Sequence, residues 1–148
     1  FESNTKIKNY EIFKKYPSGL IVDIEETIFF GKINLDGKIY LVGSNGKLSK
    51  NDPNIKLPYV FGKPNLGDFI EFKKNIDESK FSFEQIQNIY FFSSKRWDIE
   101  FKNKVLLKLP KYNTKKSLND IFEFINYLEL KDIKIIDARI KNQIILND

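Results

Sequence analysis

Two dipeptides that favour tight turns separate a run of short apolar segments, and this pattern constrains the fold more than any other feature of the sequence. Asp36-Gly37 and Asn45-Gly46 both tolerate the positive φ angles that two-residue hairpin turns require. The segments around them read as strands over about 28–35, 38–43 and 47–49. The sequence therefore predicts an antiparallel meander in this part of the chain.

A second hairpin is predicted nearer the amino terminus. Residues 20–27 alternate apolar and polar side chains, which is the period of a strand with one buried face. The Tyr16-Pro17-Ser18-Gly19 stretch before them has the residues of a turn, since Pro fixes one dihedral angle and Gly permits positive ones. We therefore expect residues 7–15 and 20–27 to pair.

Two segments predict helices. Asn65 can cap a helix over about 66–75. Ser117 followed by Asp120 approximates a capping box, and apolar residues recur at helical spacing over 118–128. Both helices are expected to bury one face.

The rest of the chain adds strands on either side of the second helix. Their composition is rich in β-branched and aromatic side chains, and Lys141-Asn142 is expected at the last turn. The predicted strands are 86–93, 96–102, 104–109, 133–139 and 143–146. The sum is an α+β fold, an extended, mostly antiparallel, curved β-sheet with two helices packed on it.

The sequence contains neither His nor Cys, which removes most nucleophilic triads, zinc sites and the commonest general base. Carboxylates remain, but Glu25 and Glu26 are strand neighbours that point to opposite faces. Asp98 and Glu100 share a face opposite Trp97, and we interpret that face as solvated. No glycine-rich phosphate loop or calcium loop is present. We therefore expect no catalysis, no cofactor and no metal, although a carboxylate-dependent hydrolase stays as the least supported alternative.

The formal charge of +5 and the 15% aromatic content allow a single-stranded nucleic-acid-binding module as the main alternative function. The lysines are scattered among carboxylates rather than gathered, which favours an ordinary solvated surface. Trp97, the single Trp, is expected in the core, with a cation–π pair to Arg96 as the other interpretation. Arg139 shares a strand face with Asp137, so it either forms a surface ion pair or belongs to a partner-binding edge.

The chain of 148 residues begins at Phe1 and contains no Met, so we expect it to be excised or matured from something longer. No stretch approaches the ~18 consecutive apolar residues of a membrane span. Any membrane anchor is expected outside these residues.

Four segments in order resemble the extracytoplasmic part of the FtsQ/DivIB family of bacterial cell-division proteins. They are YPSGLIVDIEET at 16–27, INLDGKIYLVGSNGKL at 33–48, KRWDIEFKNKVLLKL at 95–109 and IIDARIKNQIIL at 135–146. Two departures concern the last segment, where Ile140 stands in place of a frequent Tyr and Asn142-Gln143 replaces a turn of small residues.

The resemblance implies a non-enzymatic divisome scaffold. Residues 1–27 would be the carboxy-terminal hairpin of a POTRA domain, and 28–148 the β-domain, in the periplasm at the division septum. A single membrane span, a cytoplasmic tail and the rest of the POTRA domain would lie outside this chain. The scaffold would link septum assembly to control of septal peptidoglycan synthesis.

The partners implied by the resemblance are FtsB-like and FtsL-like proteins, with other septal wall-synthesis proteins as further candidates. An FtsB-like segment would add a strand to the exposed edge of the last strands. Carried over by position, the partner-binding residues are Arg139, Ile140, Asn142, Gln143, Ile144, Ile145 and Leu146, with Arg96 as a second contact.

Overall fold

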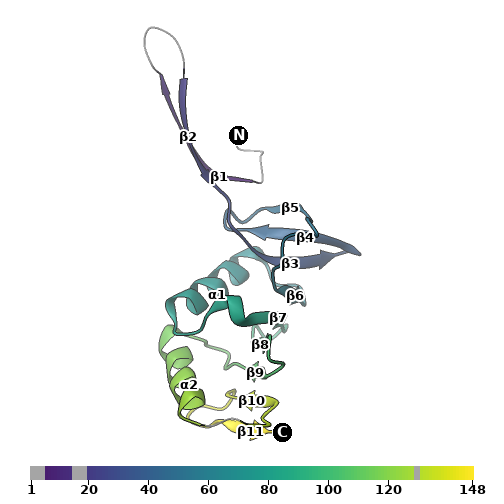
Figure 1. The fold of residues 1–148 in the computed structure, drawn as a ribbon, viewed down its shortest axis with the longest axis vertical. Coiled ribbons are helices and arrows are strands. Elements are labelled where there is room, and N and C mark those ends of the chain that lie inside the picture. The colour runs from purple at the N-terminus through teal and green to yellow at the C-terminus, as the bar shows by residue number, and fades with distance from the viewer. Residues whose placement is uncertain (1–5, 15–19, 129–130) are drawn as a thin grey trace. The chain divides into compact units, whose positions relative to one another are not determined.

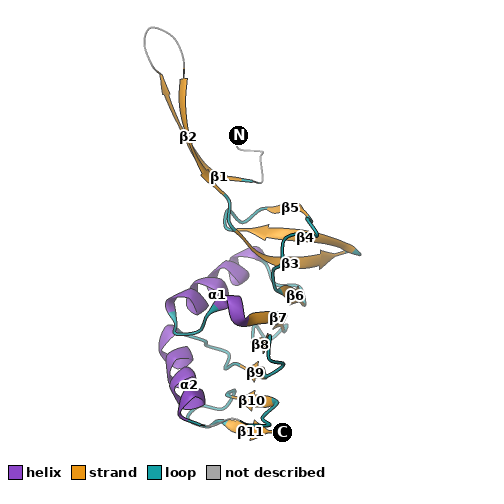
Figure 2. Cartoon of the chain, viewed as in Figure 1, coloured by secondary structure: helices purple, strands orange, loops and turns teal. Residues whose placement is uncertain are grey.

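A computed structural model describes residues 6–14, 20–128 and 131–148. The chain divides into two compact units, residues 1–57 and 58–148. Figure 1 traces the chain through both units and Figure 2 distinguishes helices from strands. Each unit is described below by itself.

The first unit begins with the predicted hairpin. Strands β1 (Ile7–Lys14) and β2 (Leu20–Glu26) pair antiparallel, with Tyr10 opposite Ile24. The turn predicted at residues 16–19 lies outside the described residues. The hairpin is thus confirmed, while its assignment to a POTRA domain stays a prediction.

The predicted meander follows as β3 (Phe29–Leu35), β4 (Lys38–Gly43) and β5 (Leu48–Lys50). Adjacent strands pair antiparallel. Asp36 and Gly37 both have positive φ, 51° and 82°, as the tight turn between β3 and β4 requires. Side chains from β3 and β4 form the core of this unit, and the most buried are Ile33, Leu41 and Val42.

The second unit contains six strands, two α-helices and one short 3-10 helix, η1 (Phe83–Gln85), among its described residues. The strands are β6 (Tyr59–Phe61), β7 (Ile86–Phe91), β8 (Trp97–Phe101), β9 (Leu106–Lys108), β10 (Ile135–Asp137) and β11 (Ile145–Asn147). They lie side by side in the order β11-β10-β9-β8-β7-β6. The five predicted strands are present but shorter, and β6 was not predicted. The fold is α+β with mostly antiparallel pairs, as expected.

Two pairings in this unit are parallel, and a helix connects each of these pairs. Helix α1 (Leu66–Glu78) joins β6 to β7, and α2 (Lys115–Tyr127) joins β9 to β10. Parallel neighbours need such a crossover because a tight turn cannot bring the chain back to the same end of the sheet. In each case the next strand then pairs antiparallel with the one before it, β8 with β7 and β11 with β10.

The same topology, strand–helix–strand–strand, therefore occurs two times in the second unit. The first copy is β6-α1-β7-β8 and the second is β9-α2-β10-β11. The two copies join where β8 and β9 pair antiparallel. The strand β11 thus holds the place in the second copy that β8 holds in the first.

The helix caps explain where both helices begin. Asn65 caps α1 as predicted, with its Oδ1 accepting a hydrogen bond from the Asp68 N–H at 2.7 Å. The cap predicted at Ser117 is wrong, because α2 begins earlier and Thr114 is its N-cap. Thr114 Oγ1 accepts from the Ser117 N–H at 3.3 Å, so Ser117 lies inside the first turn.

The helices cover one face of the second unit, as Figure 1 shows for both α1 and α2. The Trp97 ring stacks on Phe72 of α1 with centroids 4.5 Å apart, and Trp97 is only 5% exposed. The expectation that Trp97 belongs to the core is confirmed. Leu118 and Ile121 bury the inner side of α2. Neither helix of the described chain has the length and apolar character needed to cross a membrane.

Candidate partner-binding site

The edge strand β11 is the first element of the site. Within the described residues β11 pairs only with β10, with Leu146 opposite Ile136 and Ile145 opposite Asp137. The Asn147 carbonyl accepts from the Lys134 N–H at 2.9 Å, so the Asn147 backbone faces β10. Successive residues of a strand face opposite edges, and the Leu146 N–H and C=O therefore point away from β10.

The two side-chain faces of β11 differ. Leu146 is half-buried and lies on the same side as Ile136, which faces the helices and is 1% exposed. Ile145 is 44% exposed on the other side, beside Asp137. We call the side away from the helices the open face.

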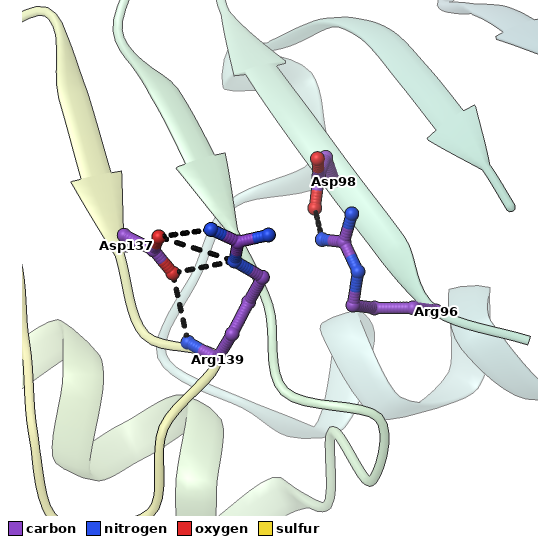
Figure 3. A network of polar contacts seen from close by, with 4 residues as sticks. All are labelled: Arg96, Asp98, Asp137 and Arg139. Atoms are coloured by element: carbon purple, nitrogen blue, oxygen red, sulfur yellow. Dashed lines mark hydrogen bonds and ion pairs between the residues drawn. The ribbon is translucent and has the colours of Figure 1, made fainter. Parts of the chain in front are cut away.

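A charged cluster lies on the open face next to this edge. It consists of Arg96, Asp98, Lys108, Asp137 and Arg139. Asp98, Lys108 and Asp137 stand opposite one another on β8, β9 and β10. Figure 3 shows the Arg96–Asp98 and Arg139–Asp137 pairs on the same side of the strands. The two arginines predicted as partner contacts are 43 positions apart in the sequence, and the fold places them on the same side of the sheet.

Arg139 binds Asp137 through its side chain and its backbone. Its Nε donates to Asp137 Oδ1 at 2.9 Å, its Nη2 donates to Oδ2 at 2.6 Å, and its N–H donates to Oδ1 at 3.1 Å. The Arg139 hydrogen bond holds the pKa of Asp137 below its ordinary value, and Asp137 raises the pKa of Arg139. The ion pair between Arg139 and Asp137, one of the two interpretations from the sequence, is present. The hydrogen bonds to Asp137 do not use Arg139 Nη1.

Arg96 pairs with Asp98, and its guanidinium carbon lies 4.3 Å from the centre of the Phe92 ring. The cation–π contact is therefore to Phe92 rather than to Trp97. Asp98 is only 4% exposed, so the interpretation of its strand face as solvated is wrong at this position. Burial raises the pKa of Asp98, and Arg96 and Lys108 oppose that rise.

Arg96, Asp98 and Lys108 of the charged cluster also line a broad groove of about 580 Å³ on the open face. Glu100 accepts hydrogen bonds there from Asn88 Nδ2 at 2.9 Å and from the Tyr90 hydroxyl at 2.7 Å. These hydrogen bonds lower the pKa of Glu100. The pKa of Tyr90 is raised, mainly by burial and also by the neighbouring Glu100 carboxylate. The groove is lined by Tyr90, Phe92, Arg96, Asp98, Glu100, Lys104, Leu106, Lys108, Lys134 and Ile135.

A second groove lies on the helix side of the same edge. It occupies about 720 Å³ between α2, the segment 110–114 before it, and residues 138–144, which connect β10 to β11. We call it the α2 groove. Phe124 of α2 and Ile140 line it and are 37% and 54% exposed.

The predicted site residues divide between these surfaces. Arg139, Ile140, Asn142 and Gln143 lie in the connection between β10 and β11 rather than in strands, and all four are exposed. The turn predicted at Lys141-Asn142 is confirmed, and the Gln143 N–H donates there to the Ile140 carbonyl at 3.1 Å. The flanking strands were predicted too long, because β10 ends at Asp137 and β11 begins at Ile145. Ile144 is half-buried just before β11. Lys108 and Asp137 were missed as site residues, although strand alternation places both on the face of Asp98.

A scan against protein-family models adds the identity of the chain. The model described as "Cell division protein FtsQ/DivIB, C-terminal" matches residues 33–139, which is well over half of the chain. The chain belongs to the FtsQ/DivIB family. No individual curated protein matches it. The family recognised from the order of short motifs is thus confirmed, and with it a role in cell division.

The FtsQ/DivIB match covers some of the site and not the rest. Arg96 and Arg139 lie within it, and Arg139 is its last residue. Strand β11 and residues 140–144 lie beyond it. The contacts at the edge strand therefore rest on the geometry of this chain.

Three acidic side chains on the open face of this FtsQ/DivIB domain are bonded within the domain itself. Asp98 and Asp137 each bind an arginine, and Glu100 is bonded to Asn88 and Tyr90. The described residues hold no group of three or more carboxylates arranged to bind a metal ion. Each arginine of the charged cluster already pairs with a carboxylate, so the cluster keeps a net charge of only +1. One such charge can meet a single carboxylate, but it does not favour a surface that binds the many phosphates of single-stranded nucleic acid.

Proposed function

We propose that this FtsQ/DivIB domain is a non-catalytic divisome scaffold that binds FtsB-like and FtsL-like proteins by β-strand addition at β11. The observation that carries the proposal is the outward-facing backbone of Leu146 on an edge strand of a cell-division domain. Such an edge supplies main-chain hydrogen bonds for affinity and alternating side chains for specificity.

The topological repeat supports the proposal and gives the added strand a direction. The outer edge of β8 in the first copy is covered by β9, which runs antiparallel to it. The outer edge of β11 is the equivalent place in the second copy. We therefore expect the partner strand to run antiparallel to β11, as β9 does to β8.

The charged cluster supports an acidic group in the partner. Arg139 uses its Nε, Nη2 and backbone N–H on Asp137, and its remaining Nη1 can reach a further acceptor. The Arg139 side chain is 46% exposed in its pair, so a partner carboxylate can approach it. A carboxylate beside Arg139 and Arg96 would form charge-assisted hydrogen bonds, which are stronger than neutral ones.

We place this domain outside the cytoplasmic membrane at the division septum, held by a single membrane span elsewhere in the protein. From there it would link septum assembly to the control of septal peptidoglycan synthesis, with other septal wall-synthesis proteins as further partners. The identity of the chain as an FtsQ/DivIB protein supports this location.

The test uses NMR shifts of the 148-residue chain on addition of the carboxy-terminal segment of the FtsB-like protein from the same organism. We expect shifts concentrated in β11 and the charged cluster. Leu146→Pro removes the outward N–H and should abolish these shifts, whereas Leu146→Val keeps the amide and should bind. Ile144→Pro, just before the strand, should weaken binding less than Leu146→Pro does.

The signals of β7 and β8 report whether the Leu146→Pro variant is folded. Binding by a folded Leu146→Pro variant at unchanged affinity would rule out strand addition at β11. The absence of any shift in the unmodified chain would rule out the FtsB-like partner.

A further inference from the structure

The two copies of the repeated topology carry equivalent hollows beside their helices. The third, sixth, seventh and tenth residues of α1 line one hollow, and the same positions of α2 line the α2 groove. These residues are Asp68, Glu71, Phe72 and Asn75 in α1, and Ser117, Asp120, Ile121 and Phe124 in α2. The strand connection after β7 contributes Lys95 to the first hollow, as residues 138–144 contribute to the second.

The chain itself occupies most of the first hollow. The residues after β9 turn toward α1, where Leu109 is completely buried and donates its N–H to the Trp97 carbonyl at 3.2 Å. Asn113 follows and is 9% exposed at the wall of the hollow. Only about 240 Å³ remains open there.

The described residues leave the second hollow open. The α2 groove has about 720 Å³ of space, three times that of its counterpart. The tenth residue of α2 is Phe124, whereas the tenth residue of α1 is Asn75. The α2 groove therefore has an apolar side chain at a position where the first hollow has a polar one. In the first copy, the segment that enters the hollow is the one that follows β9, the strand paired antiparallel with β8. The repeat therefore indicates that the α2 groove fits a segment that follows a strand paired antiparallel with β11.

The charge on the rim of the α2 groove indicates which kind of segment it favours. Lys111, Lys116 and Lys141 line it, against the single carboxylate of Asp120. Arg139 also lines the groove, but its guanidinium is bound to Asp137 on the open face. Lys116 already pairs with Asp120 at 2.7 Å. The excess of cations favours an acidic segment.

We propose that the α2 groove binds the residues that follow the partner's added strand, an acidic segment with a bulky apolar side chain placed as Leu109 is after β9. This inference rests on the proposed strand addition at β11, and it extends the interface from the edge of the sheet to the helix side. The apolar side chain packs against Phe124 and Ile121, and acidic groups meet the lysines of the rim.

The experiment compares two peptides from the FtsB-like protein, one ending at the last residue of its strand and one continuing for six further residues. Isothermal titration measures both against the 148-residue chain. We expect the longer peptide to bind at least about tenfold more tightly, since a buried apolar anchor at an interface commonly has an effect of this size. The Phe124→Ser variant should lose most of this preference, and the rim lysines should retain the rest.

Tyr127→Ser is the matched control, because Tyr127 is an aromatic residue of the same helix, is 89% exposed and lies outside the groove. Equal preference for the longer peptide in Phe124→Ser and Tyr127→Ser would overturn the inference while leaving strand addition intact. A Phe124→Ser variant that melts much earlier than Tyr127→Ser but keeps the preference would also overturn it. Failure of both peptides to bind the unmodified chain would overturn the proposed function as well.

Lys141→Glu tests the rim, with Lys102→Glu as control on the turn between β8 and β9. Lys141→Glu should weaken binding of the longer peptide, and this loss of affinity should be larger at low salt, where charges are less screened. Lys102→Glu should change neither the affinity nor its dependence on salt. A loss of equal size in both variants would indicate only a general charge effect.

Discussion

Replacing Arg96 by Gln should destabilise the domain in a way that depends on pH. Arg96 is the ion partner of Asp98, whose side chain is 5% exposed. The change leaves a carboxylate buried without that partner, and it also removes the cation from the Phe92 ring. Glutamine keeps hydrogen-bonding capacity, so the main loss is the charge.

The size of the effect follows from the burial of the pair. Breaking a fully buried ion pair by removing one partner costs about 3–5 kcal/mol. The Arg96 side chain is 17% exposed and Lys108 still faces Asp98, so the pair is only partly withdrawn from water. We therefore expect a loss of about 2–3 kcal/mol in the free energy of unfolding at neutral pH.

The sign of the pH dependence follows from Asp98. Its pKa in the folded protein is already raised by burial, and loss of Arg96 raises it further. Between the ordinary value of an aspartate and this raised value, the folded state binds the proton more strongly than the unfolded state does. The destabilisation should therefore shrink as pH falls through the raised pKa.

Urea unfolding followed by the fluorescence of Trp97, the single Trp, measures this effect at pH 7 and at the lowest pH at which both variants remain folded without urea. Arg96→Gln/Asp98→Asn should recover part of the loss at pH 7, because the buried charge is gone. Arg139→Gln is the control for a more exposed pair and should destabilise the domain clearly less than Arg96→Gln does. An Arg96→Gln loss below about 0.5 kcal/mol at pH 7, or an equal loss at both pH values, would refute this reasoning.

Three further changes test other parts of the structure. Arg139→Gln should raise the pKa of Asp137 toward its ordinary value, measured by carboxyl NMR titration, and should remove the stabilisation that the unmodified chain loses as pH falls through the lowered pKa. Gly62→Ala should cost about 1–3 kcal/mol in urea unfolding, because φ is +93° and the new Cβ would lie 2.3 Å from the Phe91 carbonyl oxygen. Phe72→Ala should cost about 3–5 kcal/mol in the same assay, since it empties a buried site; a loss under 1 kcal/mol in either variant would contradict the packing described.

Local chemistry carried most of the fold prediction. Asp36-Gly37 forms the turn expected of it, and Asn65 caps α1, because both features depend on a few neighbouring residues. Trp97 lies in the core, as the usual burial of Trp side chains predicted. Strand alternation gave the ion pair between Asp137 and Arg139 as one of two interpretations, since the two residues are only two positions apart.

Features that depend on distant parts of the chain were missed. Asp98 is buried because Arg96 and Lys108 lie over it from neighbouring positions of the folded sheet, and alternation alone gives no measure of this cover. Thr114 and Ser117 are both acceptable caps, and the choice depends on how the chain leaves β9. The α2 groove joins residues from three segments, so no single stretch of sequence indicates it.

The three-residue length of β10 and β11 has a consequence for the energetics of recruitment. So short a ladder at the end of a sheet should open locally at a free energy well below that of global unfolding, and its amides should exchange with solvent early. A strand bound outside β11 would close this ladder from the other side and slow that exchange. Partner binding and the ordering of the last residues would then be one linked equilibrium, in which a change that loosens the ladder lowers affinity without touching the partner.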